Sequence, residues 1–313
     1  MIKKTRNGFT LLELVFVIVI MGILAKFGVG FIAEAYRNFI FSSINNKLQA
    51  KSEYAVETIA KRLQGRIKPS VIYRDMNYGN SDVNFRSLQT GTDVNASVLE
   101  WIGYDTDGYR TGYWDGVLDL NKSDLNRVVT IKSDTSNEDR MIKSLSDDNS
   151  TFDDAAIFFV GEAMPVTNNW GWDGNVSLFD VQANVDIHPV RKSTSASEKN
   201  MYYPIKGSGA DNNFSNVEAK EYYKLAWSAY AVSLEDYNTT TKMGNLYLYY
   251  NYQPWKGEQY DESGKGIRKV LIQDSVSSFQ FRAVGSLIKI QVCSKDNLIA
   301  DEEYSICKEK TVY

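Results

Sequence analysis

The hydrophobic pattern divides the chain into two unlike parts, and the first part is a long apolar run near the N-terminus. Residues 9–33 carry only two charges, Glu13 and Lys26. These 25 residues, at about 1.5 Å of rise each, are enough to cross a hydrocarbon layer of about 30 Å as a helix. The sequence therefore predicts that this segment inserts into a membrane.

The helical pattern continues past the apolar run with a different character. Residues 34–68 place apolar side chains at every third or fourth position among charged ones, which indicates an amphipathic helix. Pro69 is predicted to end it, because an interior proline removes a helical hydrogen bond. We expect one helix over 9–68, transmembrane at 9–33 and amphipathic at 34–68, about 90 Å long.

From residue 69 onward the periodicity changes from three or four to two. The stretches "NLYLYYNY", "SSFQFRAV" and "SLIKIQV" alternate as half-exposed antiparallel strands do. Runs of β-type composition lie at 98–103, 127–132, 155–160, 176–181, 222–234, 246–252, 270–274, 279–284 and 287–292. Two polar stretches, 133–154 and 191–216, are predicted to be long loops. The expected fold is α+β: the apolar stripe of the helix packs on an antiparallel sheet in a head over 69–313.

Composition and charge narrow the choice of partners. The chain has 313 residues, 43% hydrophobic and 24% charged, with a net charge of −4. No Lys/Arg block resembles the basic tracts that bind phosphate backbones, so no nucleic-acid partner is predicted.

The two cysteines, Cys293 and Cys307, suggest a covalent link near the C-terminus. A disulfide closing so short a loop stabilises a fold by about 3 kcal/mol and requires an oxidising compartment. Two free, partly buried thiols are the alternative. Two cysteines and one histidine cannot make a four-ligand zinc site.

The residues flanking the apolar run set its orientation and raise a question about Glu13. Lys3, Lys4 and Arg6 precede the run, so the positive-inside rule places the N-terminus in the cytoplasm and the head across the membrane. A cleaved secretory signal has a shorter apolar core without an acid at its start. An uncleaved single-pass anchor explains the length but leaves Glu13 as a cost of a few kcal/mol.

The stretch "RNGFTLLELVFVIVIMGILA" resembles the N-terminus of type IV prepilins and type II secretion pseudopilins. Those proteins begin with a short basic leader ending in Gly, followed by Phe, Thr, Leu, Leu, Glu and a hydrophobic helix. The resemblance implies that prepilin peptidase removes a leader, residues 1–8, by cutting between Gly8 and Phe9. Phe9 then becomes the N-methylated terminus, and Glu13 is the family's acid.

The resemblance also implies a role for that acid in assembly. A buried carboxylate becomes tolerable when it meets a cation, and the new amine at Phe9 of a neighbouring subunit is such a cation. Glu13 would then draw the subunit into register with a growing filament. A role for Glu13 only in recognition by the peptidase is the alternative.

As the resemblance implies, the protein is a structural minor subunit of a type IV pilus or a type II secretion pseudopilus. Its length resembles the larger minor pilins or the J-type minor pseudopilins, and a retained Glu13 argues against the extreme tip. The implied partners are prepilin peptidase, other pilin or pseudopilin subunits, an inner-membrane assembly platform and membrane lipid. The implied location is the inner membrane, single-pass with a periplasmic head, and then the filament. The same helix serves pili, DNA-uptake machines and secretion pseudopili.

One acidic stretch, "GYDTDGYRTGYWDG", carries the only candidate metal ligands that the sequence suggests. Its D-x-D-G start resembles the opening of a calcium loop, since hard cations bind clustered carboxylates. However, the fifth position counted from Asp105 is Tyr109, and no Glu stands at the twelfth. A solvated turn is predicted, with a calcium site shared by Asp105, Asp107 and Asp115 as the alternative. No other cofactor or metal is predicted.

Catalysis is not expected from this composition. His188, the only histidine, lies in "DIHPV", far from any Gly-x-Ser-x-Gly turn, and is predicted to lie on the surface or in a loop. The aromatic clusters at 170–172 and 249–255 are predicted to pack in the core, with a carbohydrate- or partner-binding surface as the alternative. A membrane-anchored adhesin, a ligand-binding periplasmic protein and an anchored hydrolase are the remaining function classes.

Overall fold

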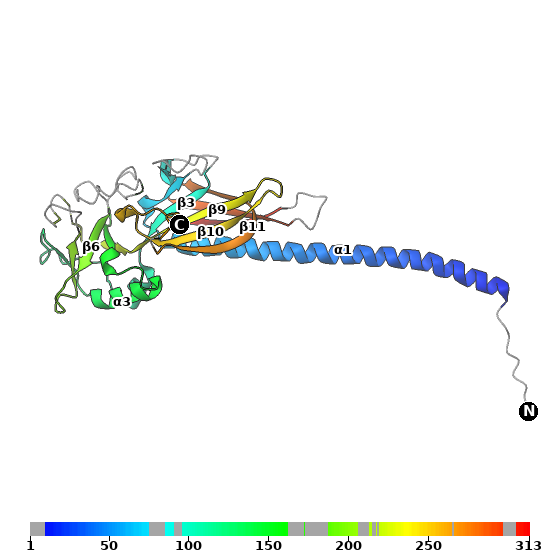
Figure 1. The fold of residues 1–313 in the computed structure, drawn as a ribbon, viewed down its shortest axis with the longest axis horizontal. Helices are drawn as coiled ribbons and strands as arrows, with labels where there is room; N and C mark the ends of the chain where they lie inside the picture. The colour runs from blue at the N-terminus through cyan, green and yellow to red at the C-terminus, as the bar shows by residue number, and fades with distance from the viewer. Residues whose placement is uncertain are drawn as a thin grey trace, which may run out of the picture.

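The structure is a computed structural model that describes residues 10–74, 85–90, 96–161, 172, 187–205, 213–214, 217, 219–264, 266–296 and 305–313. One long helix, α1 (Leu11–Gln64), projects from a β-rich head (Figure 1). Only its second half contacts the head, through a buried stripe at the spacing of one helical face. The stripe consists of Ile44, Leu48, Ser52, Ala55, Val56, Ile59, Ala60 and Leu63. The predicted α+β fold is confirmed.

The helix ends before the proline that was predicted to end it. Gly65 N donates to Arg62 O at 3.2 Å, and the chain then runs beside a strand, where Ile67 N donates to Ile102 O at 2.8 Å. Pro69 lies in the following 3-10 turn, η1 (Lys68–Ser70). The helix therefore stops because the backbone starts to pair with the sheet, not because the proline blocks it.

An eight-stranded antiparallel sheet, the main sheet, forms the part of the head next to α1. Its order is β13-β12-β11-β10-β9-β3-β1-β2. The strands are β1 (Ile72–Arg74), β2 (Phe85–Ser87), β3 (Val98–Gly103), β9 (Ser228–Asn238), β10 (Met243–Tyr252), β11 (Arg268–Val284), β12 (Leu287–Lys295) and β13 (Ser305–Val312). The 3-10 turns η2 (Leu88–Thr90) and η6 (Pro254–Lys256) connect parts of it. The second half of α1 covers β11, β12 and β13, and a continuous apolar core fills the space between them.

The strands β3 and β9 are hydrogen-bonded neighbours although residues 104–227 separate them in the sequence. This insertion forms a second unit, here called the distal lobe, at the end of the head away from the projecting helix (Figure 1). It contains α2 (Thr106–Thr111), α3 (Thr135–Ser146), η3 (Phe152–Asp154) and an antiparallel sheet of order β4-β7-β6-β5-β8. The strands are β4 (Val128–Val129), β5 (Ala156–Phe159), β6 (His188–Lys192), β7 (Met201–Pro204) and β8 (Tyr223–Ala226).

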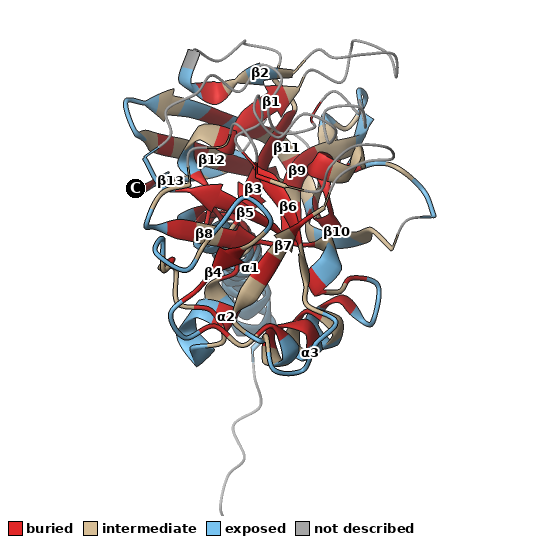
Figure 2. Cartoon of the chain, turned by 90° about the vertical axis from the view of Figure 1, so that its left-hand side faces the viewer, coloured by how far each residue is buried: buried red, intermediate tan, exposed pale blue. Residues whose placement is uncertain are grey.

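The sheet of the distal lobe curls toward closure around its own core. The segment 116–119 bridges the two edge strands: Tyr223 N donates to Gly116 O at 3.0 Å, and Asp119 N donates to Val129 O at 2.8 Å. Trp114, Tyr202 and Phe159 are among the buried residues inside. Seen from this end, the central strands are mostly buried, whereas α2 and α3 keep exposed outer turns (Figure 2).

Two predicted loops are wrong in part. Within 133–154, Thr135–Ser146 forms α3, whose N-cap Asp134 accepts hydrogen bonds from Ser136 N and Asn137 N. The large apolar residues of this helix are Met141, Ile142 and Leu145, all in its second half, so the apolar pattern is too short to stand out in the sequence. Within 191–216, β7 pairs with β6. The predicted strand at 176–181 lies outside the described residues.

The predicted position of the single histidine is also wrong. His188 is 2% exposed and lies between Phe159 and Phe214, with ring centroids 5.2 and 6.3 Å away. Burial lowers its pKa to about 3, so the imidazole is neutral in the folded protein at ordinary pH. In contrast, core packing is confirmed for Tyr249, Tyr252 and Trp255.

The buried histidine predicts a specific acid sensitivity. The unfolded chain protonates His188 near its ordinary pKa of about 6.5, whereas the folded protein resists protonation down to about 3. The free energy of unfolding should therefore fall as the pH drops through this window, by at most about 1.4 kcal/mol per pH unit from this group. Urea unfolding of wild type and His188→Phe at several pH values measures this effect. The free energy of unfolding of wild type relative to that of His188→Phe should fall as the pH is lowered. A difference between the two proteins that does not change with pH would contradict the lowered pKa of His188.

Candidate functional site

The N-terminal half of α1 is the candidate assembly surface. Every residue from Thr10 to Ser43 is exposed, including large apolar side chains such as Phe16 and Phe31. Among the described residues, α1 is the one helix long and apolar enough to cross a membrane. A half-helix of this kind requires lipid or neighbouring helices around it.

Glu13 lies in the first turn of this exposed half, in a capping box with Thr10. Both Thr10 N and Thr10 Oγ1 donate to Glu13 Oε2 at 2.9 Å, and Glu13 N donates to Thr10 Oγ1 at 3.4 Å. The negative charge faces the positive end of the helix dipole, which favours it. Both contacts to the carboxylate use Oε2, so within the described part of the chain Oε1 is left for a further donor.

Gly8 and Phe9 lie outside the described residues. The cleavage between them and the methylation of Phe9 therefore stay predictions. What the structure describes is the start of α1 at Leu11 and the position of Glu13 in the first turn of this helix.

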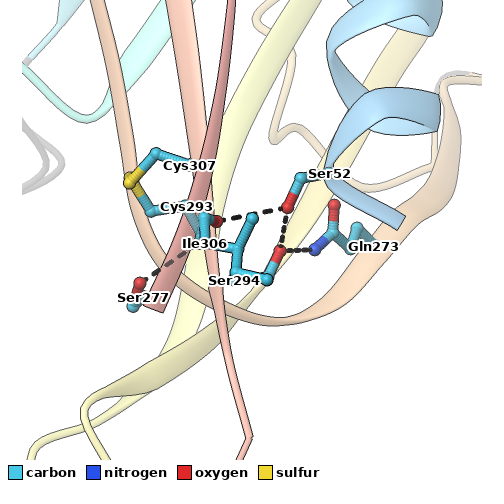
Figure 3. Close-up of a disulfide and its surroundings, with 7 residues drawn as sticks. All are labelled: Ser52, Gln273, Ser277, Cys293, Ser294, Ile306 and Cys307. Atoms are coloured by element: carbon cyan, nitrogen blue, oxygen red, sulfur yellow. Dashed lines mark hydrogen bonds between the residues drawn. A yellow bond between two sulfur atoms is a disulfide. The ribbon is translucent and has the colours of Figure 1, made fainter. Parts of the chain in front are cut away.

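A small polar network joins the helix to the head inside the buried part of their interface (Figure 3), while the ion pairs Lys51–Asp274 and Glu57–Lys310 lie at its exposed edges. The Ser52 and Ser294 hydroxyl oxygens lie 2.5 Å apart, and Gln273 Nε2 donates to Ser294 Oγ. Ser52 Oγ also donates to Ile306 O at 3.4 Å. Because these directional contacts link one turn of α1 to β11, β12 and β13, they define the position of the helix along the sheet.

The disulfide fastens the strand that α1 covers at the edge of the main sheet. Cys293 on β12 lies directly opposite Cys307 on β13, with Cα atoms 3.9 Å apart, and the two are bonded. The predicted disulfide is confirmed. Since Ser294 follows Cys293 and Ile306 precedes Cys307, the covalent link lies next to the polar network (Figure 3).

The three candidate calcium ligands are not brought together. Asp105 is the N-cap of α2, where its Oδ2 accepts hydrogen bonds from Gly108 N at 3.0 Å and Trp114 Nε1 at 3.1 Å. Asp115 accepts from Ser133 Oγ at 3.1 Å, and Asp107 is exposed. Within the described ranges, no group of three or more acidic, cysteine or histidine side chains could hold a metal ion.

Asp105 has a neighbour that the sequence reasoning missed, Glu138 on α3. A Cβ atom on Gly108 would lie 1.9 Å from Asp105 Oδ2 and 2.5 Å from Glu138 Oε2, so the two carboxyl groups converge on this glycine. Glu138 is 1% exposed, and burial together with the Asp105 charge raises its pKa to about 10. Glu138 therefore holds a proton at neutral pH. In the sequence it looked like an ordinary acid at the start of a helix.

Comparison with known proteins adds one decisive observation. The family model described as the prokaryotic N-terminal methylation motif matches residues 3–25. The chain carries the type IV pilin and pseudopilin signature. No curated protein and no solved structure matches it significantly. The pilin-like motif includes Glu13 and the start of α1, and it implies peptidase processing and contacts with other pilin subunits in general.

Removing the disulfide should weaken the head of this pilin-like chain. The double variant Cys293→Ser/Cys307→Ser is expected to lose about 3 kcal/mol of unfolding free energy, since the cross-link restricts the unfolded chain. Urea unfolding with and without reductant measures this: reductant should lower the wild-type midpoint and leave that of the double variant unchanged. Coincident curves for both proteins without reductant would contradict the prediction.

The carboxyl pair predicts the opposite pH dependence from that of His188. Folded wild type keeps the Glu138 proton up to a pH of about 10, whereas the unfolded chain releases it near its ordinary pKa of about 4.3. The contribution of this proton to the free energy of unfolding is complete below a pH of about 4.3 and is lost as the pH rises toward 10. The stability of Glu138→Gln relative to wild type should therefore increase with pH, by at most about 1.4 kcal/mol per unit. A pH-independent difference in urea unfolding would refute the raised pKa of Glu138.

Proposed function

We propose that this chain is a minor structural subunit of a type IV pilus or type II secretion pseudopilus, processed by prepilin peptidase and assembled through α1. The observation that carries the proposal is Glu13, an acid in the first turn of an exposed apolar half-helix, inside the methylation motif. The N-terminus is cytoplasmic and the head periplasmic before assembly, as Lys3, Lys4 and Arg6 favour.

The chemistry of assembly follows from the charge on Glu13. Cutting between Gly8 and Phe9 leaves an amine, which is a cation at the depth of the acid of a neighbouring subunit displaced by about one helical turn. An unpaired carboxylate in the membrane costs a few kcal/mol, and the pairing removes that cost. Thr10 donates to Oε2 only, so Oε1 can accept from the neighbour's amine without breaking the capping box.

The shape of the head supports a subunit used in few copies. The main sheet alone covers the second half of α1, and the distal lobe extends the head further along the same axis (Figure 1). In a filament that repeated this subunit at every position, the lobe would have to fit against each neighbouring head. A subunit present in few copies avoids this requirement. The retained acid argues against the extreme tip, because a subunit beyond this one is needed to supply the amine.

A structural role in place of catalysis is part of the proposal. What supports it is the environment of His188, which is enclosed by Phe159 and Phe214 and 2% exposed. A histidine that acts as a general base needs access to substrate and a pKa near the working pH. In an anchored hydrolase that used this histidine, His188→Ala would abolish turnover.

The test is Glu13→Ala in the producing cell. Leader cleavage, followed by the mass of the mature chain, should continue, while the chain recovered in sheared filaments or the filament number should fall about tenfold or more, as expected for loss of a few kcal/mol. Glu34→Ala is the matched control, because it removes an acid of the same helix far from the N-terminal amine. Normal filaments and secretion in Glu13→Ala and in a deletion strain would refute the assignment.

A further inference from the structure

A pocket opens where the distal lobe joins the main sheet. It has a volume of about 160 Å³ and lies between the last turn of α1, the start of α2, the end of α3 and strands β9 and β10. We call it the neck pocket; the side chains that matter for its chemistry are those of Arg62, Tyr104, Asp107, Trp227, Tyr230 and Tyr250. Junctions between structural units are preferred places for small-molecule sites.

The floor of the neck pocket is aromatic and held in place by the sheet. Tyr230 on β9 lies directly opposite Tyr250 on β10, and also opposite Trp101 on β3, on which it stacks with ring centroids 5.8 Å apart. A side chain at Gly103 would come within 2.4 Å of the Tyr230 ring, so the glycine makes room for it. The ring positions therefore exist before any ligand arrives.

The rim of the neck pocket carries both a donor and an acceptor. Arg62 is exposed, with its guanidinium 5.5 Å above the Tyr230 ring, and Asp107 is an exposed carboxylate on α2. A second carboxylate, Asp105, also lines the pocket, but it is buried and accepts from Gly108 N and Trp114 Nε1. The exposed rim therefore presents one cation and one anion. A ligand that fits must offer hydroxyl groups that donate and accept, together with an apolar face for the floor.

The volume limits the ligand to about one ring. An apolar cavity of about 150 Å³ holds one benzene molecule, so 160 Å³ suits a single six-membered ring. A purely aromatic ring would leave the charged rim without partners, and a cationic one would lie against Arg62. A neutral sugar ring satisfies both the floor and the rim.

We propose that the neck pocket binds one pyranose ring, with a C–H face on Tyr250 and hydroxyls bonded to Asp107 and Arg62. This inference goes beyond the filament role, because it gives the head a carbohydrate-binding site of its own. Arg62 belongs to the last turn of α1, far along the helix from Glu13 and the exposed first half, so either function can fail without the other.

The test uses the full chain in phospholipid nanodiscs, free of glycoside detergents that would occupy the site. The probes are the methyl pyranosides of glucose, galactose, mannose and N-acetylglucosamine. Their binding is followed by saturation-transfer NMR and by tryptophan fluorescence, since Trp227 lines the pocket. At least one glycoside should bind saturably, and Asp107→Asn and Tyr250→Ala should each weaken it about tenfold.

Matched controls separate the neck pocket from the rest of the surface. Asp124→Asn and Tyr237→Ala change exposed residues outside the pocket and should leave the affinity unchanged. Asp107→Asn alters only an exposed side chain, so it tests the site even where Tyr250→Ala impairs folding. The proposal is overturned by no saturable binding of any glycoside, by binding that neither pocket variant weakens, or by binding of p-cresol in preference to every glycoside.

Discussion

The structure depends on one packing contact: the second half of α1 against β11, β12 and β13. Its buried stripe, from Ile44 to Leu63, meets the core of the main sheet, while the residues from Thr10 to Ser43 on the same helix are exposed. Because α1 is continuous, this contact also sets where Glu13 lies relative to the head. The Ser52–Ser294 contact and the disulfide beside it stabilise that position at the edge of the sheet.

The distal lobe, at the other end of the head, takes no part in this packing contact. The distal lobe enters between two strands that are already neighbours, β3 and β9, so the main sheet closes without it. The lobe has its own core, and two of its buried titratable groups are neutral: His188 is unprotonated and Glu138 is protonated. An insertion of this kind adds binding surface, such as the neck pocket, without altering the helix that assembles.

The sequence was most informative where the physical signal is local. The apolar run, the acid and the amphipathic stripe predicted α1 and its two halves, and period-two stretches predicted β10, β11 and β12. The sequence was less informative where contacts between distant residues determine an element. The large apolar residues of α3 lie only in its second half. Strand β13, "SICKEKTV", contains several charged side chains, so its sequence does not show a buried face. Likewise, nothing within a local window shows that Glu138 meets Asp105 or that His188 is enclosed by Phe214. Such pairs exist only once the lobe has folded.

The central claim, that the Glu13 carboxylate meets the amine of another subunit, is tested most directly by zero-length cross-linking in isolated filaments. Dicyclohexylcarbodiimide enters apolar regions and joins a carboxylate to an amine only when the two are in contact. Mass spectrometry should then find the peptide containing Glu13 bonded to the N-terminal residue of a neighbouring subunit, and should not find it in Glu13→Gln filaments. Cross-linked filaments in which Glu13 is never joined to a neighbour's N-terminus would contradict the account.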